Sequence, residues 1–280
     1  MTLSEIERGM SALAPYRRPA LFNDFLIQGY MAITLSSVPQ TQFSNLLQAK
    51  LCLGTIITLY DDFADRPSQC NPQLLEILYQ LDFVKCQGLQ SLNIQDRQVI
   101  AFAECLFSQI AGVLSPLPHR RRFGPVLDFD LAQFYSANRY SSLVTANPFI
   151  NNAFENRAYG HHNMGMVMVS MMDLMAIEQV EFSEIGAIRE IFLLGQRMGR
   201  IFNVLATRKR EIADGDVTGE LATYSERETK LVEKRLHQEI CDLCTAIEGF
   251  APRITTFSVT AYLAGLMKVQ KLHERLEGVI

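Results

Sequence analysis

Three aspartates, Asp61, Asp62 and Asp65, follow the nearly continuous apolar run 51–59 and stand just before Pro67. In a helix, residues four apart are neighbours on one face, so Asp61 and Asp65 would present their carboxylates together, while Asp62 falls off that face. Mg²⁺ takes hard oxygen ligands and is commonly shared between carboxylates and a substrate phosphate. The spacing therefore predicts a magnesium site suited to a diphosphate, although aspartates at a helix end are also often simply solvated.

A second set of oxygen-bearing side chains lies in the stretch 201–211, inside another long helical pattern. Asn203, Thr207 and Glu211 are spaced four and four, so a helix would align an amide carbonyl, a hydroxyl and a carboxylate in one stripe. All three groups can ligate a hard cation. Taken alone, this stripe is more typical of a polar outer face of a helix. The presence of two oxygen-rich sets in one sequence favours a metal site to which both contribute.

The two stretches together resemble the class I terpene synthases, and in particular their bacterial members. The aspartates match the DDxxD motif, and the stripe matches the Asn-Asp-x-x-Ser-x-x-x-Glu motif with Thr in place of Ser. The segment Asp214-Gly215-Asp216 also resembles the one that follows this motif in bacterial members. The resemblance implies that Arg157, 46 positions before Asn203 (203 minus 157), is the arginine that senses the diphosphate.

An all-α fold follows from the resemblance: a single-domain class I terpenoid synthase helical bundle around a central apolar cavity. The implied activity is that of a carbon–oxygen lyase, which ionises a prenyl diphosphate with three Mg²⁺ ions and cyclises the carbocation to a terpene hydrocarbon or alcohol. The implied substrates are farnesyl, geranylgeranyl or bicyclic twenty-carbon diphosphates. The matching catalytic residues are Asp61, Asp65, Arg157, Asn203, Thr207 and Glu211, and all of these except Arg157 are the implied metal ligands.

Three features depart from the family pattern. Val204 stands where Asp is common, and Arg210 replaces the usual Lys, which changes a point ammonium into a planar fork of donors. The Arg-Tyr pair that many bacterial members carry near the C-terminus is missing; the basic residues there are Lys268, Lys271, His273 and Arg275. The sequence therefore leaves open which group holds the diphosphate at that end.

Substrate contacts are expected from side chains close to these motifs. A carbocation is favoured by aromatic faces and by a dry cavity, and methionine can line an adaptable apolar surface. The candidates are Arg157, Arg210, Phe63, Phe154, Met164, Met168 and Phe202. Helical spacing puts Met164 and Met168 on one face and points Met166 away from it. Simple core packing is the alternative for each apolar member of this set.

Helical periodicity recurs along the whole chain, and no alternating strand pattern is found. After an arm interrupted by Pro15 and Pro19, helices are predicted at about 20–35, 40–60, 73–86, 96–113, 120–140, 150–177, 184–213, 226–250 and 254–276. Gly160 and Gly165 should interrupt the helix that carries Arg157. No linker or repeat marks a domain boundary, so residues 1–280 are predicted to form one domain.

Composition limits the partners. The net charge is −4 with scattered basic residues, which predicts no nucleic-acid surface. No apolar run approaches the roughly 20 residues that span a bilayer, so no membrane span and a cytoplasmic location are expected. The expected partner is therefore a small-molecule prenyl diphosphate, and the sequence also allows a homodimer.

Two alternative functions stay open. A prenyltransferase of the isoprenoid synthase superfamily would carry two aspartate-rich motifs, which the Asn203, Thr207 and Glu211 stripe fits poorly. A non-catalytic prenyl-binding helical protein would need no metal ligands, and the intact stripe argues against it. Asp128 and Asp130 do not form the DxDD motif of protonation-initiated cyclases, so ionisation is the expected chemistry.

Overall fold

Helices make up the regular structure in the computed structural model, which describes residues 1–90, 93–221 and 224–276. These ranges contain no β-strand, so the predicted all-α fold is confirmed. The α-helices are α1 (Leu3–Leu13), α2 (Ile27–Ile33), α3 (Gln40–Asp65), α4 (Pro72–Leu78), α5 (Ile94–Leu114), α6 (Arg120–Ala146), α7 (Ala153–Tyr159), α8 (Met166–Ala176), α9 (Ile185–Asp214), α10 (Glu226–Glu248) and α11 (Val259–Arg275). A π-helical turn, Leu21–Leu26, precedes α2.

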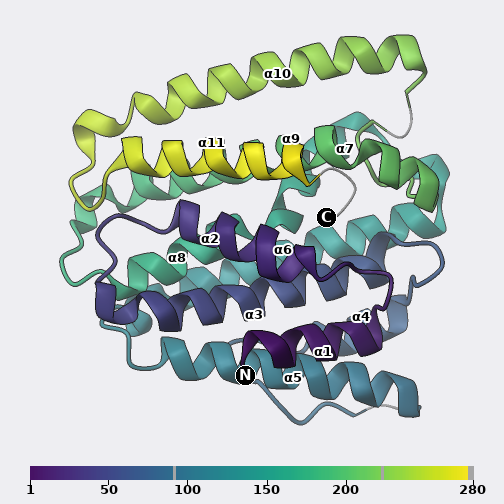
Figure 1. The fold of residues 1–280 in the computed structure, drawn as a ribbon, viewed down its shortest axis with the longest axis horizontal. Helices are drawn as coiled ribbons and strands as arrows, with labels where there is room; N and C mark the ends of the chain where they lie inside the picture. Colours follow the sequence, from purple (N-terminus) through teal and green to yellow (C-terminus); the bar gives the residue numbers. More distant parts are fainter. Residues whose placement is uncertain (91–92, 222–223, 277–280) are drawn as a thin grey trace.

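The helices lie side by side, with α10 at one edge of the bundle and α5 at the other (Figure 1). Every residue of α3 from Ala49 to Ile56 is buried, as is every residue of α8. A helix that is apolar all round belongs in an interior, whereas α10 buries only a periodic set on one face. The helix that ends in the aspartates therefore runs through the core.

A buried ion pair joins the two central helices. Lys50 Nζ of α3 lies 2.6 Å from Asp173 Oδ1 of α8, and both side chains are fully buried. Lys50 also donates to the Thr34 hydroxyl at 2.9 Å, and the Leu35 N–H donates to Asp173 Oδ2 at 3.0 Å. Burial lowers the pKa of Lys50 and raises that of Asp173. Each charge offsets the lost hydration of the other, and the ion pair with its two hydrogen bonds links α3, α8 and the end of α2.

The interruption predicted at Gly160 and Gly165 is present. Helix α7 ends at Tyr159, a 3₁₀ segment covers Gly160–Met164, and α8 begins at Met166. Gly165 has φ 61°, a left-handed conformation that favours glycine, and a Cβ atom there would collide with Ile57 Cδ1. The chain therefore changes direction close to α3.

Helix boundaries differ from the predictions in several places. The helix predicted over 73–86 ends at Leu78, and the one predicted from residue 20 begins with the π-helical turn. The helices predicted over 40–60 and 120–140 continue to Asp65 and Ala146. Helix α5 is the one described helix that is long and apolar enough to cross a membrane by length and composition. It packs on α3 within the bundle. A core helix passes the same test, so α5 is weak support for a membrane span.

Candidate active site

A cavity of about 140 Å³ lies between α2, α3, α9, α11 and the break before α8. Its polar lining comes from the C-terminal parts of α3 and α9 and from neighbouring loops: Arg17, Thr58, Asp61, Asp65, Asn163, Arg200, Asn203, Arg210, Glu211, Asp216 and Thr218. The rest is largely apolar and includes Leu21, Phe25, Leu26, Gly29, Tyr30, Ile33, Gly54, Ile57, Met164, Met166, Val269 and His273. Two predicted oxygen-rich stripes, 138 positions apart at Asp65 and Asn203 (203 minus 65), thus meet in one place.

Asp61 and Asp65 both face this cavity from the last turns of α3. Burial raises the pKa of Asp61, and the Arg17 charge partly counters that increase. Burial, together with the charges of Asp61 and Asp216, raises the pKa of Asp65 well above its usual range. Two crowded carboxylates of this kind are a strong site for a cation, because a cation removes their mutual repulsion.

Asp62 lies off the central cavity, as the helical spacing indicates. Its carboxylate receives Arg17 Nη2 at 2.7 Å and Arg17 Nε at 3.2 Å, and Arg66 Nη1 lies 3.9 Å away. Asp62 is almost fully buried, and the Arg17 side chain is only 10% exposed. The pair ties the N-terminal arm to α3 and brings a guanidinium into the cavity lining.

The stripe on α9 is partly satisfied within the helix. The Thr207 hydroxyl lies 2.6 Å from Glu211 Oε1 and 2.8 Å from the Asn203 carbonyl oxygen. Asn203 and Glu211 line the cavity, whereas fully buried Thr207 does not. Glu211 Oε2 is buried and has no hydrogen-bond partner in the described part of the chain. A buried acceptor without a donor lowers the stability of the fold unless a bound ligand pairs with it.

Two arginines of α9 line the cavity beside these ligands. Arg200, three residues before Asn203, places Nη1 3.4 Å from Asn203 Oδ1. Burial raises the pKa of Glu211, and the positive charge of Arg200 partly counters that increase. Arg210 also lines the cavity, and its Nε is buried without a hydrogen-bond partner among the described residues. Sequence reasoning missed Arg200, although its i, i+3 spacing from Asn203 would have placed it on the same face.

The turn after α9 returns a further carboxylate to the site. Gly215 has φ 71° and caps the helix, and the Asp216 N–H donates to the Glu211 carbonyl at 2.9 Å. Asp216 lines the cavity, and its Oδ1 accepts from the N–H and the hydroxyl of Thr218, both at 2.7 Å. The family resemblance includes the segment Asp214-Gly215-Asp216, but it assigns no role to Asp216.

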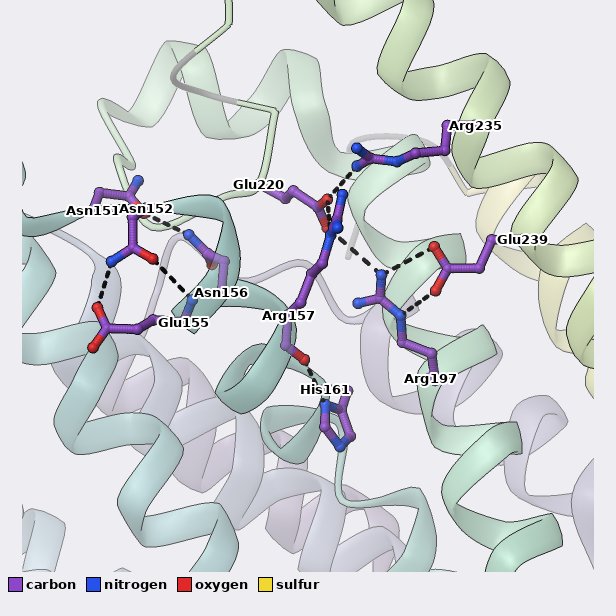
Figure 2. Close-up of polar contacts among 10 residues, drawn as sticks. All are labelled: Asn151, Asn152, Glu155, Asn156, Arg157, His161, Arg197, Glu220, Arg235 and Glu239. Atoms are coloured by element: carbon purple, nitrogen blue, oxygen red, sulfur yellow. Dashed lines mark hydrogen bonds and ion pairs between the residues drawn. The ribbon is translucent and has the colours of Figure 1, made fainter.

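Arg157 is not brought to the cavity. Its side chain is 44% exposed, and its Nε lies 3.6 Å from Glu220 Oε1. Figure 2 shows its guanidinium pointing to Glu220, a buried carboxylate that also receives Arg235 Nη2 at 2.8 Å. Arg197 lies 3.9 Å from the same carboxylate. In the described structure Arg200, packed against Gly160, occupies the cavity wall that Arg157 was expected to reach.

The predicted apolar contacts divide into three groups. Met164 lines the cavity. Met168 and Phe202 are buried in the core outside the cavity lining, and Phe63 is partly buried against that core. Phe154 is 83% exposed and contacts no cavity wall. Met166, which was predicted to point away, lines the cavity, because α8 starts afresh after Gly165 and the helical count from Met164 does not carry across the break.

No family model matches the chain, and no curated protein matches it. Among solved structures it is similar to isoprene synthase from grey poplar leaves (Populus × canescens), with a TM-score of 0.67 and 14% identity over 97% of this chain. The chain therefore shares its all-α fold with the matched part of the poplar enzyme. The same poplar enzyme in complex with three Mg²⁺ ions and dimethylallyl-S-thiolodiphosphate gives a TM-score of 0.63 and 15% identity.

This chain spans about half, 52%, of the isoprene synthase chain. At such low identity the likeness to a terpene synthase is one of fold. It supports the resemblance seen in the motifs, and the bacterial type stays a prediction, because both neighbours are plant enzymes.

The donor set of this cavity suits a hard divalent cation. Carboxylates of Asp61, Asp65 and Glu211 and the amide oxygen of Asn203 line one cavity, and Glu211 Oε2 lacks a partner. No three carboxylate, histidine or thiol groups of the described residues already converge as a preformed metal site. The chain therefore offers two half-sites, one on α3 and one on α9, that a cation with its own water and phosphate ligands could join.

Proposed function

We propose that this protein is a class I terpene synthase, a carbon–oxygen lyase that ionises a prenyl diphosphate and converts the carbocation to a terpene by cyclisation or proton loss. The observation that carries the proposal is the meeting of the α3 aspartates and the α9 stripe across one cavity whose remaining wall is largely apolar. A diphosphate needs the polar end and a prenyl chain needs the apolar wall. We further propose a soluble cytoplasmic enzyme with a single domain over residues 1–280.

Asp61 and Asp65 on one side and Asn203 and Glu211 on the other are the proposed ligands of Mg²⁺. Bound Mg²⁺ would neutralise the charge that develops on the diphosphate as its carbon–oxygen bond breaks. Thr207 would hold Glu211 in position through its hydrogen bond, because the hydroxyl is buried behind that carboxylate. Thr207, which the motif resemblance implies as a further metal ligand on α9, would reach the metal only after this bond opens.

Arg200 and Arg210 are the proposed diphosphate contacts. Both line the cavity beside the metal ligands, and the unpartnered Nε of Arg210 is a donor ready for an anionic oxygen. Arg17 adds a positive charge to the cavity lining while it holds Asp62. Arg157 stays a proposed sensor only for a state in which it has left Glu220.

The size of the cavity bears on the substrate. A volume of about 140 Å³ is close to that of a cavity that takes up a benzene molecule, which is about 150 Å³. Because the polar end of the same cavity would also hold the diphosphate, this volume favours a short prenyl chain. A farnesyl or geranylgeranyl chain would require wall side chains such as Phe25 and Met164 to move outward.

Purified protein incubated with Mg²⁺ and diphosphates of five, ten, fifteen and twenty carbons tests the proposal. We expect diphosphate release together with a volatile hydrocarbon or alcohol from at least one of them. A longer prenyl diphosphate formed from a mixture with isopentenyl diphosphate would identify a prenyltransferase. Binding of all four substrates without release of diphosphate would identify the prenyl-binding protein.

A further inference from the structure

His273 is a buried polar side chain in an apolar part of the cavity wall. It is only 2% exposed, and its Nδ1 has no hydrogen-bond partner in the described part of the chain. The ring of Phe25 meets the imidazole edge-on at 4.6 Å, and the ring of Phe202 lies 6.4 Å away. Buried polar atoms are nearly always paired, so an imidazole kept here without a partner calls for a functional reason.

The position of His273 is unusual in a second way. A separate hollow of about 370 Å³ lies between α9, α10 and α11. Its lining includes Glu233, His237 and Glu274, and the last two are exposed, so this outer hollow reaches solvent. Among the described residues that line either space, His273 is the only one shared by the outer hollow and the central cavity. Its ring therefore stands between the substrate space and water.

The chemistry of the proposed function requires a base at this point of the reaction. When a carbocation ends as an alkene, a neighbouring C–H bond breaks, its electron pair forms the new C=C bond, and the proton must go to an acceptor. Of the four cavity carboxylates, Asp61, Asp65 and Glu211 are the proposed metal ligands. The fourth, Asp216, accepts two hydrogen bonds from Thr218 at the polar end, where the released diphosphate would also lie, and the arginines are already charged. Burial lowers the pKa of His273 to about 3, which keeps the imidazole neutral and therefore able to accept a proton.

We propose that His273 is the base that takes the terminating proton from the carbocation and then releases it to water in the outer hollow. This inference rests on the proposed terpene synthase function. The proton passes from carbon to an imidazole nitrogen, and the imidazolium, disfavoured by its buried site, returns the proton to solvent before the next turnover. No oxidant or further reactant is needed.

The test compares His273→Phe and His273→Gln with the wild type on dimethylallyl, geranyl and farnesyl diphosphates, with diphosphate release and organic products measured in parallel. His237→Gln is the matched control, since His237 lines only the outer hollow. We expect both His273 variants to release diphosphate within about threefold of the wild-type rate, because ionisation occurs at the metal end. The share of the main alkene should fall about tenfold in favour of alcohols and other alkenes.

A melting curve separates this role from a structural one. His273→Phe should melt no lower than the wild type, because the ring it replaces has no hydrogen bond at Nδ1 to lose. Normal diphosphate release with an unchanged product spectrum in both variants would overturn the inference alone. A wild-type protein that releases no diphosphate from any of the substrates would overturn the proposed function and this inference with it.

Discussion

Replacing Asp65 with Asn should stabilise the metal-free protein while it abolishes catalysis. Asp65 and Asp61 are one helical turn apart, so their carboxylates are about 6 Å from each other. At an effective dielectric constant of about 20, two like charges at that distance repel by about 3 kcal/mol. The nearby Arg17 charge offsets part of this, which leaves a net gain of about 1 to 3 kcal/mol on removing one charge.

The assay is a melting curve in EDTA at two pH values. For a chain of this length 1 kcal/mol corresponds to about 2 °C, so Asp65→Asn should melt about 2 to 6 °C higher than the wild type at pH 8. A carboxyl whose pKa is raised in the folded state costs no stability below its ordinary pKa and imposes its full cost above the raised pKa. The cost of Asp65 therefore declines as the pH falls from the raised pKa toward the ordinary value of 3.8, and the gain of the variant should be smaller at pH 5 than at pH 8.

Asp62→Asn provides the matched control, because it breaks the buried pair with Arg17 and should lower the melting temperature in the same buffer. Mg²⁺ should raise the melting temperature of the wild type, and do so much less in Asp65→Asn. A variant at position 65 that melts lower than the wild type in EDTA at pH 8, or that responds to Mg²⁺ as fully as the wild type, would refute the reasoning.

Three further outcomes are expected. Glu211→Gln and Asp61→Asn should each lower kcat by about 100-fold or more with the fold intact by circular dichroism, and EDTA should abolish wild-type activity until Mg²⁺ is restored. Arg200→Lys should lose about 100-fold in kcat/KM, because an ammonium cannot replace a fork of donors. Arg157→Lys should lose less than about fivefold, and the reverse order of the two losses would return the sensor role to Arg157. Met164→Phe and Met166→Phe should shift the preference toward a shorter substrate, and an unchanged preference would place both methionines outside the substrate space. Met168→Phe should instead lower the free energy of unfolding by about 1 to 3 kcal/mol, because it overpacks the core.

The sequence was sufficient to predict the fold class and the elements that meet at the site. Helical spacing alone placed Asp61 and Asp65 on one face and Asp62 off it, because all three lie within one uninterrupted helix. The same holds for Asn203 and Glu211 on α9. Periodicity is reliable wherever a helix is long and its phase is unbroken.

The remaining parts of the site depend on contacts that no local pattern encodes. Arg17 comes from an irregular arm, and its place is set by the distant carboxylate of Asp62. Met166 was misplaced because the left-handed conformation of Gly165 resets the phase of the helix. Arg157 could be aligned by sequence separation, but its direction is decided by Glu220, 63 positions later (220 minus 157).

Gly54 has a consequence for how such an enzyme could change its product. It lines the cavity from α3, the same helix that carries Asp61 and Asp65, and a Cβ atom there would collide with the Tyr30 hydroxyl and crowd Leu26. A larger residue would therefore displace side chains of the π-helical turn Leu21–Leu26 and of α2, while Asp61 and Asp65 stay where the buried part of α3 holds them. Single substitutions at Gly54 could therefore change the product range of related enzymes while each of those enzymes keeps its metal ligands and its activity.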